Sequence, residues 1–316
     1  MSGAAPAVGV IGGGPWGLAL ARATRRAKRA EVVLYTRRHD EAAHPGIRIV
    51  RTLAPLAETP LIIMAVPSPV VRLVARDLGD HVSGRHMVVH GIRGLSDDDL
   101  LTVSQILRDE TPVRRLGALG GPVQAPELHS GRASAMIVGS AFPDVTATVA
   151  ATLDGPWLQV KTTRDLLGLE WAAALMGCLS VGLGYAQVRE DVSPGLLAAL
   201  LSGAVDEAVG IARVAGADAS TLYGLGGYGD LLASMALPGR PEVVVGRALA
   251  RGATPAEAQR EAELRVEAVD LVPRVARFAQ RHGVAHGFFA ALAEILSGAA
   301  SPEAAVAKLF RVARPD

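Results

Sequence analysis

The stretch GGGPWG at residues 12–17 constrains the fold of this chain more than any other feature. It follows a short apolar run, AVGVIG at 7–12, and it leads into WGLALARATRRAKRA at 16–30, where apolar residues recur at helical spacing. A strand, a glycine-rich turn and a helix in this order are typical of the first βα unit of a dinucleotide-binding fold.

Each glycine of this G-x-G-x-x-G pattern has a physical task. Gly12 makes the tight turn, Gly14 lets the backbone approach a pyrophosphate, and Gly17 lets the helix pack closely on the sheet. The N-terminus of the helix supplies free N–H groups to an anion. Because the chain has 35 glycines, a purely structural turn is the alternative, but the flanking strand and helix favour dinucleotide binding.

The first half of the chain alternates short β-branched runs with helical patterns, which is typical of a parallel α/β sheet. After the first strand, further strands are predicted at 31–36, 46–50, 61–67, 86–92, 113–122, 132–140 and 157–163. After about residue 164 the patterns are helical, with helices predicted at 195–216, 264–278, 286–298 and 302–313. The sequence therefore predicts an N-terminal Rossmann dinucleotide-binding domain over residues 1–164 and an all-helical domain over residues 165–316.

Composition excludes several classes of partner. Lys and Arg number 32 and Asp and Glu 31, which gives no electrostatic reason to expect nucleic acid or an anionic membrane surface. The single cysteine, Cys178, excludes an internal disulfide framework and fits a reducing compartment. No His, Cys or Asp cluster has the spacing of a metal site, so no metal is expected.

The run from Trp171 to Val188 carries no charge and just reaches the length of a membrane span. It contains three glycines, and it also holds Ser180 and Gln187. These residues favour a buried helix that breaks near Gly182 and Gly184 over a membrane-spanning one.

The end of the second predicted strand bears on the choice of cofactor. NAD-specific sites usually hold an acid there for the ribose 2′-hydroxyl, whereas NADP sites often hold an arginine. This chain reads YTRR at 35–38 and has no acid before Asp40. Arg37 is therefore the candidate for contact with a 2′-phosphate, and Arg38 is interpreted as a solvated cation. NADP or NAD is expected as the cofactor, with a preference for NADP.

Six segments resemble, in order, the NAD(P)-dependent glycerol-3-phosphate dehydrogenase family. They are VGVIGGGPWGLALA, IIMAVPS at 62–68, GIRG at 91–94, GGPVQAPE at 120–127, GLEWAAALMG at 168–177 and LGGYGDLLAS at 225–234. The resemblance covers nearly the whole chain. It implies an arrangement like that of 6-phosphogluconate dehydrogenase, with substrate bound in the cleft between a Rossmann domain and a helical domain. It also implies a cytoplasmic homodimer that interconverts dihydroxyacetone phosphate and glycerol 3-phosphate.

The cofactor half of the chain fits the family position by position. The resemblance assigns eight residues to the dinucleotide, namely Gly12, Gly14, Trp16, Gly17, Pro67, Ser68, Ala125 and Glu127. Two more are expected to contact it, namely Pro15 at the start of the helix and Arg37 at the end of the second strand.

The catalytic half departs from the family. Arg93 stands where the family carries the lysine of a K-G turn, and Met176 and Gly177 stand where it carries a catalytic Lys-Asn pair. The family's Asn and two Arg on the next helix fall on Pro194, Leu196 and Ser202. The resemblance leaves Asp230, Ser234 and Arg93 as catalytic residues, and it assigns Arg240 and Met176 to a phosphorylated or otherwise anionic substrate.

These departures affect proton transfer. Reduction of a ketone needs a hydride and a proton, and a lysine with a depressed pKa supplies the proton well. Arginine stays charged, and methionine has no proton to give. Substitute acids are Asp230 through a water, His90, and Tyr185 or Tyr228. The alternatives are that His90 is a strand-end residue facing solvent and that Tyr185 belongs to the core, which leaves Tyr228 as the better tyrosine.

Two functions remain open. The first is an NAD(P)-dependent oxidoreductase that acts on glycerol phosphate, or on a less polar substrate, at a partly apolar site. The second is a catalytically impaired dinucleotide-binding homologue that acts as a sensor or as a protein-interaction partner.

Overall fold

The computed structural model describes residues 7–27, 31–37, 44–96, 99–299, 304 and 308. The chain divides into two compact units. The sheet unit comprises Met1–Ile92 and Leu101–Glu170, and the helical unit comprises Arg93–Leu100 and Trp171–Asp316. The short segment that begins at Arg93 thus groups with the helices. The boundary predicted between residues 164 and 165 stays a prediction.

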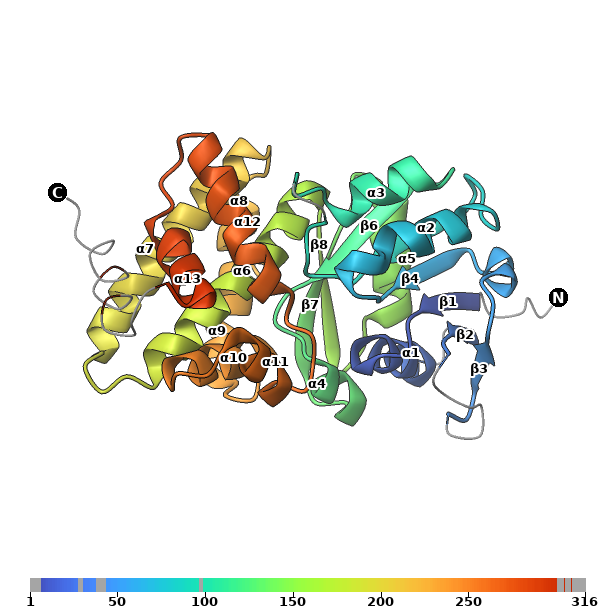
Figure 1. Ribbon diagram of the computed structural model, residues 1–316. Helices are drawn as coiled ribbons and strands as arrows, with labels where there is room; N and C mark the ends of the chain where they lie inside the picture. Colours follow the sequence, from blue (N-terminus) through green and yellow to red (C-terminus); the bar gives the residue numbers. More distant parts are fainter. Residues whose placement is uncertain are drawn as a thin grey trace. The chain divides into compact units, whose positions relative to one another are not determined.

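The sheet unit is built on one sheet of eight strands in the order β3-β2-β1-β4-β5-β6-β7-β8. Its strands are β1 (Ala7–Ile11), β2 (Glu31–Tyr35), β3 (Ile47–Val50), β4 (Leu61–Met64), β5 (Met87–His90), β6 (Arg115–Gly120), β7 (Ser134–Gly139) and β8 (Leu158–Thr163). The order 3-2-1-4-5 is that of a Rossmann half-sheet, and it places a topological switch point between β1 and β4. Figure 1 labels all of these strands except β5.

The sheet is parallel, as the alternating pattern predicts, except that β6 and β7 are antiparallel. The segment between them holds only α4 (Ala125–Ser130), a helix of six residues. β8 in turn pairs parallel to β7, so the last two strands run opposite to the rest of the sheet.

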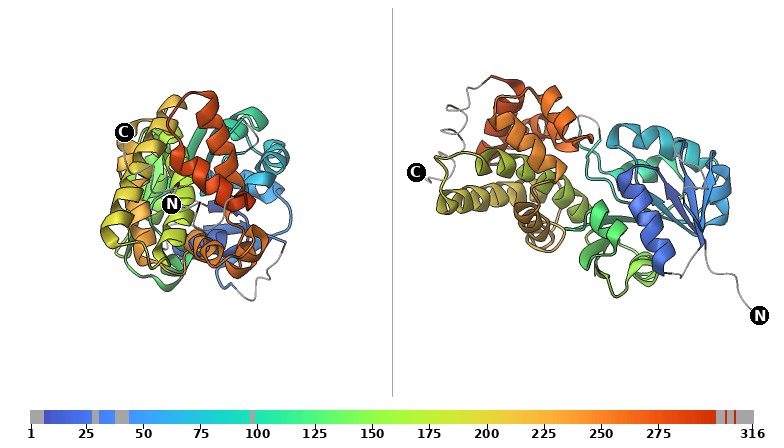
Figure 2. Two further views of the ribbon diagram at one scale, coloured as in Figure 1. Left: turned by 60° about the vertical axis from the view of Figure 1, so that its left-hand side comes forward. Right: turned by 90° about the horizontal axis from the view of Figure 1, so that it is seen from below.

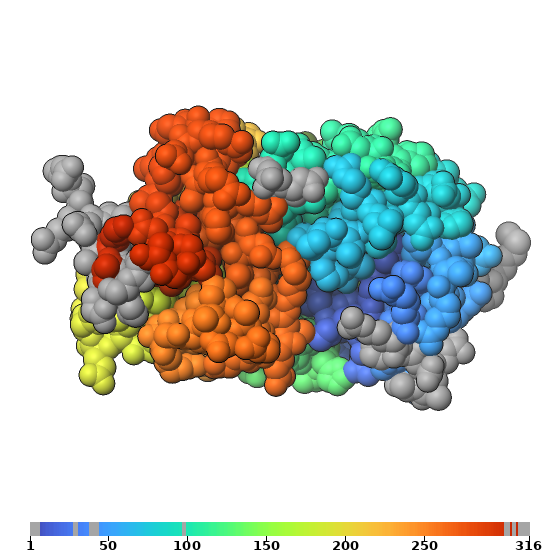
Figure 3. Space-filling model, in the orientation of Figure 1, coloured from blue at the N-terminus to red at the C-terminus, as the bar shows by residue number. Residues whose placement is uncertain are grey.

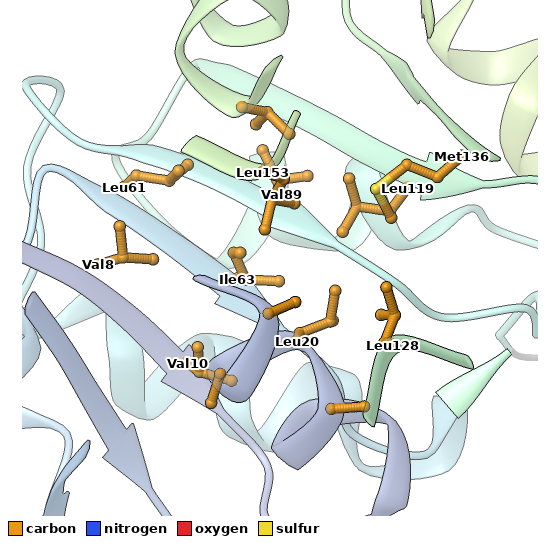
Figure 4. Close-up of a cluster of buried hydrophobic side chains, with 14 of the residues drawn as sticks. Val8, Val10, Leu20, Leu61, Ile63, Val89, Leu119, Leu128, Met136 and Leu153 are labelled. Carbon is orange, nitrogen blue, oxygen red and sulfur yellow. The ribbon is translucent and has the colours of Figure 1, made fainter. Parts of the chain in front are cut away.

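Helices cover both faces of the sheet. One face packs on α1 (Pro15–Ala27), α4 and α5 (Pro143–Leu153), and its core includes Val8, Val10 and Ile63 from the strands. The other face packs on α2 (Val71–Gly79) and α3 (Val103–Glu110). Two 3₁₀ helices, η2 (Ala54–Glu58) and η3 (Ser68–Val70), complete the unit. Figure 4 shows strand side chains meeting Leu20 of α1 and Leu128 of α4.

The helical unit contains the rest of the secondary structure. Its helices are α6 (Leu166–Gln187, which starts in the sheet unit), α7 (Pro194–Val214), α8 (Ala219–Tyr223), α9 (Tyr228–Ala236), α10 (Pro241–Ala250), α11 (Pro255–Glu261), α12 (Glu267–Arg281) and α13 (Gly287–Ser297). Figures 1 and 2 show these helices, and Figure 3 shows that α10 to α13, in orange to red, form most of this unit's visible face. The helix predicted at 302–313 lies outside the described residues, apart from Ala304 and Lys308. The predicted fold class, a Rossmann sheet followed by an all-helical region, is confirmed.

The uncharged segment forms α6, a single helix of 22 residues. The predicted break near Gly182 and Gly184 is therefore wrong. By length and composition both α6 and α7 are long and apolar enough to cross a membrane, but 89% of the apolar window of α6 is buried inside the protein. The corresponding share for α7 is 50%. The reading of α6 as a buried core helix is confirmed.

The glycines of α6 allow close packing instead of a break. A Cβ on Gly184 would lie 2.2 Å from the carbonyl oxygen of Val243, and one on Gly246 of α10 would lie 2.0 Å from the carbonyl oxygen of Val181. At these distances the backbones of α6 and α10 touch directly. A Cβ on Gly182 would lie 2.4 Å from the ring of Phe288. Gly184 is therefore a contact point with α10, and Gly182 is one with α13.

A substitution at this crossing should weaken the helical unit. We expect Gly246→Ala to lower the free energy of unfolding by about 1–3 kcal/mol, because the added methyl group meets backbone that cannot rotate away. Gly203→Ala on α7 is the matched control, since a Cβ there has no heavy atom within 4 Å among the described residues. That control should gain up to about 1 kcal/mol from helix propensity. Urea unfolding followed by circular dichroism measures both, and equal stability of the two variants would contradict the packing argument.

Candidate functional site

The glycine-rich loop joins the ends of three strands. The Gly12 N–H donates to the carbonyl oxygen of Tyr35 at 3.0 Å, and Gly12 has a φ of 114°, in the left-handed region. A Cβ on Gly12 would lie 2.2 Å from the carbonyl oxygen of Ala65, and one on Gly17 would lie 2.0 Å from the carbonyl oxygen of Gly12. Only glycine fits these two positions, which close the loop against β2, β4 and the first turn of α1.

Gly14 differs from its two neighbours. A Cβ built on Gly14 has no heavy atom within 4 Å among the described residues, so space beside its backbone is open. Its carbonyl oxygen accepts from the Leu18 N–H at 2.9 Å, and Pro15 begins α1 directly after it. An open backbone at a helix N-terminus suits a pyrophosphate group. The geometry of the loop therefore fits a dinucleotide.

Other predicted cofactor residues follow strands at the same edge of the sheet. Pro67 and Ser68 come after β4, and the carbonyl oxygen of Pro67 accepts from the Val70 N–H at 3.2 Å. Trp16, the second residue of α1, has a buried indole nitrogen without a hydrogen-bond partner among the residues that the structure describes. A Cβ on Gly91, which follows β5, would lie 2.4 Å from that nitrogen. The carboxyl ends of β1, β4 and β5 thus gather these residues near the switch point.

The remaining predicted cofactor residues lie in two further places. Arg37 is exposed directly after Thr36 at the end of β2, whereas Arg38 lies outside the described residues. Ala125 begins α4, and Glu127 forms a capping box there. A carboxylate oxygen of Glu127 accepts from the Gln124 N–H at 3.0 Å and from the Ser134 hydroxyl at 2.9 Å. Glu127 therefore organises the start of α4, and its contact with a cofactor stays a prediction.

The helical unit holds a buried ionic cluster centred on Asp230 of α9, whose side chain is fully buried. Arg93 donates to its two carboxylate oxygens at 2.6 and 3.1 Å. Arg240 donates to the same two oxygens at 2.9 and 3.1 Å. Two guanidinium groups thus hold one carboxylate, and each pair has the two-point geometry that makes such hydrogen bonds strong.

This arrangement fixes the charge of the carboxyl group. Burial raises the pKa of Asp230, but the charges and hydrogen bonds of Arg93 and Arg240 outweigh it and hold that pKa below its ordinary value. Asp230 is therefore ionised, and both of its oxygens already accept two N–H groups. The geometry speaks against Asp230 as a proton donor, whether direct or through a water.

The guanidinium of Arg240 is bonded to other groups of the protein. Its side chain is fully buried, and besides Asp230 it donates to the Ser234 hydroxyl and to Glu242 at 3.0 Å. Burial lowers the pKa of Arg240, and Asp230 and Glu242 raise it further than burial lowers it. Arg240 thus links α9 to α10. Because its guanidinium is buried and already bonded within the protein, it does not offer the contact with substrate that was predicted. Arg93, with 27% of its side chain exposed, is the accessible cation of the pair.

Ser234 and Met176 belong to the same cluster. The Ser234 hydroxyl donates to the carbonyl oxygen of Asp230 at 2.8 Å. The Ser180 hydroxyl lies 3.0 Å from that of Ser234 and 2.8 Å from the carbonyl oxygen of Met176. The Met176 side chain is completely buried on α6. The structure therefore brings Arg93, Ser234 and Arg240 together around Asp230, and Met176 is linked to this cluster only through its backbone carbonyl and Ser180.

Sequence reasoning missed Glu242, which completes the cluster. One of its oxygens accepts from Nε of Arg240, and the other lies 4.0 Å from the Cβ position of Gly177. With Glu242 the two arginines are balanced by two acids. The signal was an acid in the first turn of α10, two residues after Arg240, but a first-turn acid is common at any helix start.

The other proposed acids are His90, Tyr185 and Tyr228. The expectation that His90 faces solvent is wrong, because His90 is buried and its Nε2 lies 2.9 Å from Oε1 of Glu170. That carboxylate also accepts from the backbone N–H and the hydroxyl of Ser104, at 2.8 and 2.6 Å. Tyr185 is buried in the core, as expected, and Tyr228 is 42% exposed at the start of α9.

Two further expectations concern cysteine and metal. Cys178 is buried on α6, and burial raises the pKa of its thiol, so it has no thiolate character. The described part of the chain has no group of three or more His, Cys, Asp or Glu side chains that could hold a metal ion.

The stability of the cluster should depend on pH with a definite sign. Folding lowers the pKa of Asp230. Its contribution to the free energy of unfolding is therefore complete when the pH lies above the pKa of the unfolded state, about 3.9, and is lost as the pH falls through the pKa of the folded state. We expect Asp230→Asn to cost about 3–5 kcal/mol at pH 7, since it leaves two guanidinium groups without their carboxylate. The deficit relative to the native protein should shrink below about pH 4.

Chemical unfolding at pH 7 and at pH 3.5 measures this dependence. Asp191→Asn, which removes an exposed partner of Arg189, is the control and should change stability little at either pH. A deficit for Asp230→Asn as small as that of the control would show that the ionic cluster does not stabilise the fold.

Sequence and structure comparisons agree on one family. Residues 165–307 match the profile of the NAD-dependent glycerol-3-phosphate dehydrogenase C-terminus, and residues 47–146 match the corresponding N-terminus. Glycerol-3-phosphate dehydrogenase [NAD(P)+] of Synechococcus elongatus is 31% identical over 308 residues, covering 95% of this chain and 94% of that protein. The enzyme of the same name from Methylobacterium radiotolerans is 30% identical over 329 residues, covering 98% and 96%. The crystal structure of glycerol-3-phosphate dehydrogenase from Coxiella burnetii shares the fold, with a TM-score of 0.88, 21% identity, and coverage of 96% and 98%.

Proposed function

Because the chain belongs to the NAD-dependent glycerol-3-phosphate dehydrogenase family, we propose that it is an NAD(P)-dependent oxidoreductase acting on a CH–OH group of a small anionic substrate. We further propose that its substrate site is altered and turns over dihydroxyacetone phosphate slowly. A nicotinamide dinucleotide whose pyrophosphate lies at the glycine-rich loop would supply the hydride.

One observation carries the cofactor part of this proposal. Gly12 and Gly17 are closed against backbone, whereas Gly14 between them opens onto free space. A purely structural turn has no need for an open glycine at this position. The open backbone, followed directly by the first turn of α1, supports a pyrophosphate seat.

The altered substrate site rests on the residues of the ionic cluster. Arg93 takes the place of the family's K-G lysine, and Met176 and Gly177 take that of its Lys-Asn pair. Arg93 carries a permanently charged guanidinium, so it can hydrogen-bond a carbonyl oxygen or an anionic group but cannot protonate it. Asp230 is held ionised by the two arginines. Proton transfer at this cluster therefore lacks the donor that the family's lysine would provide.

The same residues support a second candidate function, a homologue that binds the dinucleotide but has lost catalysis. The buried Met176 and the fully engaged Asp230 favour it. The homodimer and the cytoplasmic location implied by the family also stay proposals.

A substitution at Gly14 tests the cofactor site without disturbing the fold. We expect the native protein to bind NADPH or NADH in calorimetry, and we expect Gly14→Leu to weaken binding at least tenfold by occupying the open space. The variant should keep the native melting temperature, because its side chain meets no described atom within 4 Å of the Cβ. Gly84→Leu is the control, since Gly84 also has open space and precedes β5. Failure of the native protein to bind either dinucleotide at millimolar concentration would rule out this function.

Turnover of dihydroxyacetone phosphate tests the altered substrate site. Without a positioned proton donor we expect a kcat about 10²–10⁴ lower than that of a relative with both lysines, which is roughly 3–5 kcal/mol of barrier. Met176→Lys alone should not restore activity, because a lone amine at this buried position would stay neutral or destabilise α6.

The sharper variant restores three residues together, Arg93→Lys, Met176→Lys and Gly177→Asn. Gly177 has room for a longer side chain, since the nearest atom to a Cβ there is Oε1 of Glu242 at 4.0 Å. We expect a gain in kcat from the triple variant and none from Met176→Leu, which keeps the apolar volume. Fast turnover of dihydroxyacetone phosphate by the native protein would contradict the proposal of an altered site. Dinucleotide binding with no turnover of any related alcohol would favour the second candidate.

A further inference from the structure

We infer that Arg51, which no sequence motif singled out, is a specificity-determining residue that recognises the 2′-phosphate of NADP together with Arg37. This inference rests on the proposed function, because it assumes a dinucleotide at the glycine-rich loop. It concerns the edge of the sheet formed by β1, β2 and β3.

The position of Arg51 follows from strand register. β2 and β3 are parallel, with Tyr35 paired to Val50, the last residue of each strand. The next residues, Thr36 and Arg51, therefore leave the sheet side by side at its carboxyl edge. The Thr36 N–H donates to the carbonyl oxygen of Val50 at 3.2 Å, and Nη1 of Arg51 donates to the carbonyl oxygen of Thr36 at 2.7 Å.

The same edge holds the pyrophosphate loop. Gly12 donates to the carbonyl oxygen of Tyr35, one residue before the carbonyl that holds Arg51. Neighbouring strands lie about 4.8 Å apart, so β3 is roughly 10 Å from β1. In Rossmann folds the adenosine ribose lies over the end of the second strand, which here is Thr36 and Arg37. Arg51 therefore flanks the place where the ribose 2′ position falls.

The chemistry of this edge suits a phosphate. Arg37 and Arg51 are both exposed, and neither described segment around them, 35–37 or 50–53, contains an acid that could hold a ribose 2′-hydroxyl. Guanidinium groups donate to phosphate oxygens in two-point fashion. Because the bond to Thr36 already holds the Arg51 head group at the edge, less side-chain entropy is lost when a phosphate binds. This preorganisation distinguishes Arg51 from a surface arginine that merely adds charge.

Ligand binding to the full chain tests this role without a substrate. The probes are NADPH and NADH, and the pair adenosine 2′,5′-bisphosphate and adenosine 5′-monophosphate, each measured by calorimetry. Arg51→Gln keeps a donor for the Thr36 carbonyl but removes the charge. We expect it to weaken binding of NADPH and of the bisphosphate about 10- to 100-fold, and to change binding of NADH and of the monophosphate less than twofold. Arg37→Ala should show the same selectivity.

Two further variants make the result decisive. Arg48→Gln removes an exposed arginine from the middle of the same strand and should leave all four affinities unchanged. Arg51→Lys keeps the charge and should retain a preference for NADPH even if Arg51→Gln folds poorly. Equal losses for phosphorylated and unphosphorylated probes in Arg51→Gln, or a natively melting Arg51→Gln that keeps the native preference for NADPH, would reduce Arg51 to a tie between β2 and β3. If the native protein binds NADH but has no affinity for the bisphosphate, this inference is wrong and the proposed function stands. If the native protein binds neither NADPH nor NADH, both are wrong.

Discussion

The fully buried carboxylate of Asp230 is the constraint on which the helical unit depends. A bare carboxylate in a protein interior costs far more free energy than a folded domain can spare, so it needs compensating charge within hydrogen-bond distance. Arg240 supplies one charge from the start of α10, and Arg93 supplies the other from a segment that follows β5. This pairing gives a physical reason why the stretch from Arg93 to Leu100 groups with the helices, although its neighbours in sequence belong to the sheet.

The same pairing restricts chemistry. A carboxylate that accepts four guanidinium N–H groups is a strong anchor, but its lowered pKa makes it a poor source of protons. Arg93 has a comparable limit, because its charge is permanent. The cluster is therefore suited to orienting an anionic or carbonyl group and to organising α6, α9 and α10 around it. Proton transfer at neutral pH would have to come from outside this set of residues or from bound water.

Much of the fold could be predicted from the sequence because local patterns decide it. The glycine spacing after β1 fixes the strand, the turn and the helix together, and the structure places Gly12 and Gly17 in contacts that only glycine permits. Local patterns do not carry information about partners distant in the chain. The antiparallel pairing of β7 with β6 is not indicated by the residues of either strand, and the unbroken α6 depends on glycines that meet α10 and α13. In both cases the sequence predicted the type of secondary structure, but it contained no information about which distant residues that element would contact.

The candidate site shows the same division. A family resemblance located Arg93, Asp230, Ser234 and Arg240, and the structure brings them together. It gave no information about which of them are accessible. Arg240 and Asp230 are fully buried, Glu242 has 14% of its side chain exposed and Arg93 has 27%. Among these four, Arg93 is the cation that an anionic group would meet first. The exposure of each side chain depends on residues that pack over it from elsewhere in the chain, and neither a motif nor a family resemblance contains that information. The residue types of the site could therefore be predicted from the sequence, and the accessibility of each one could not.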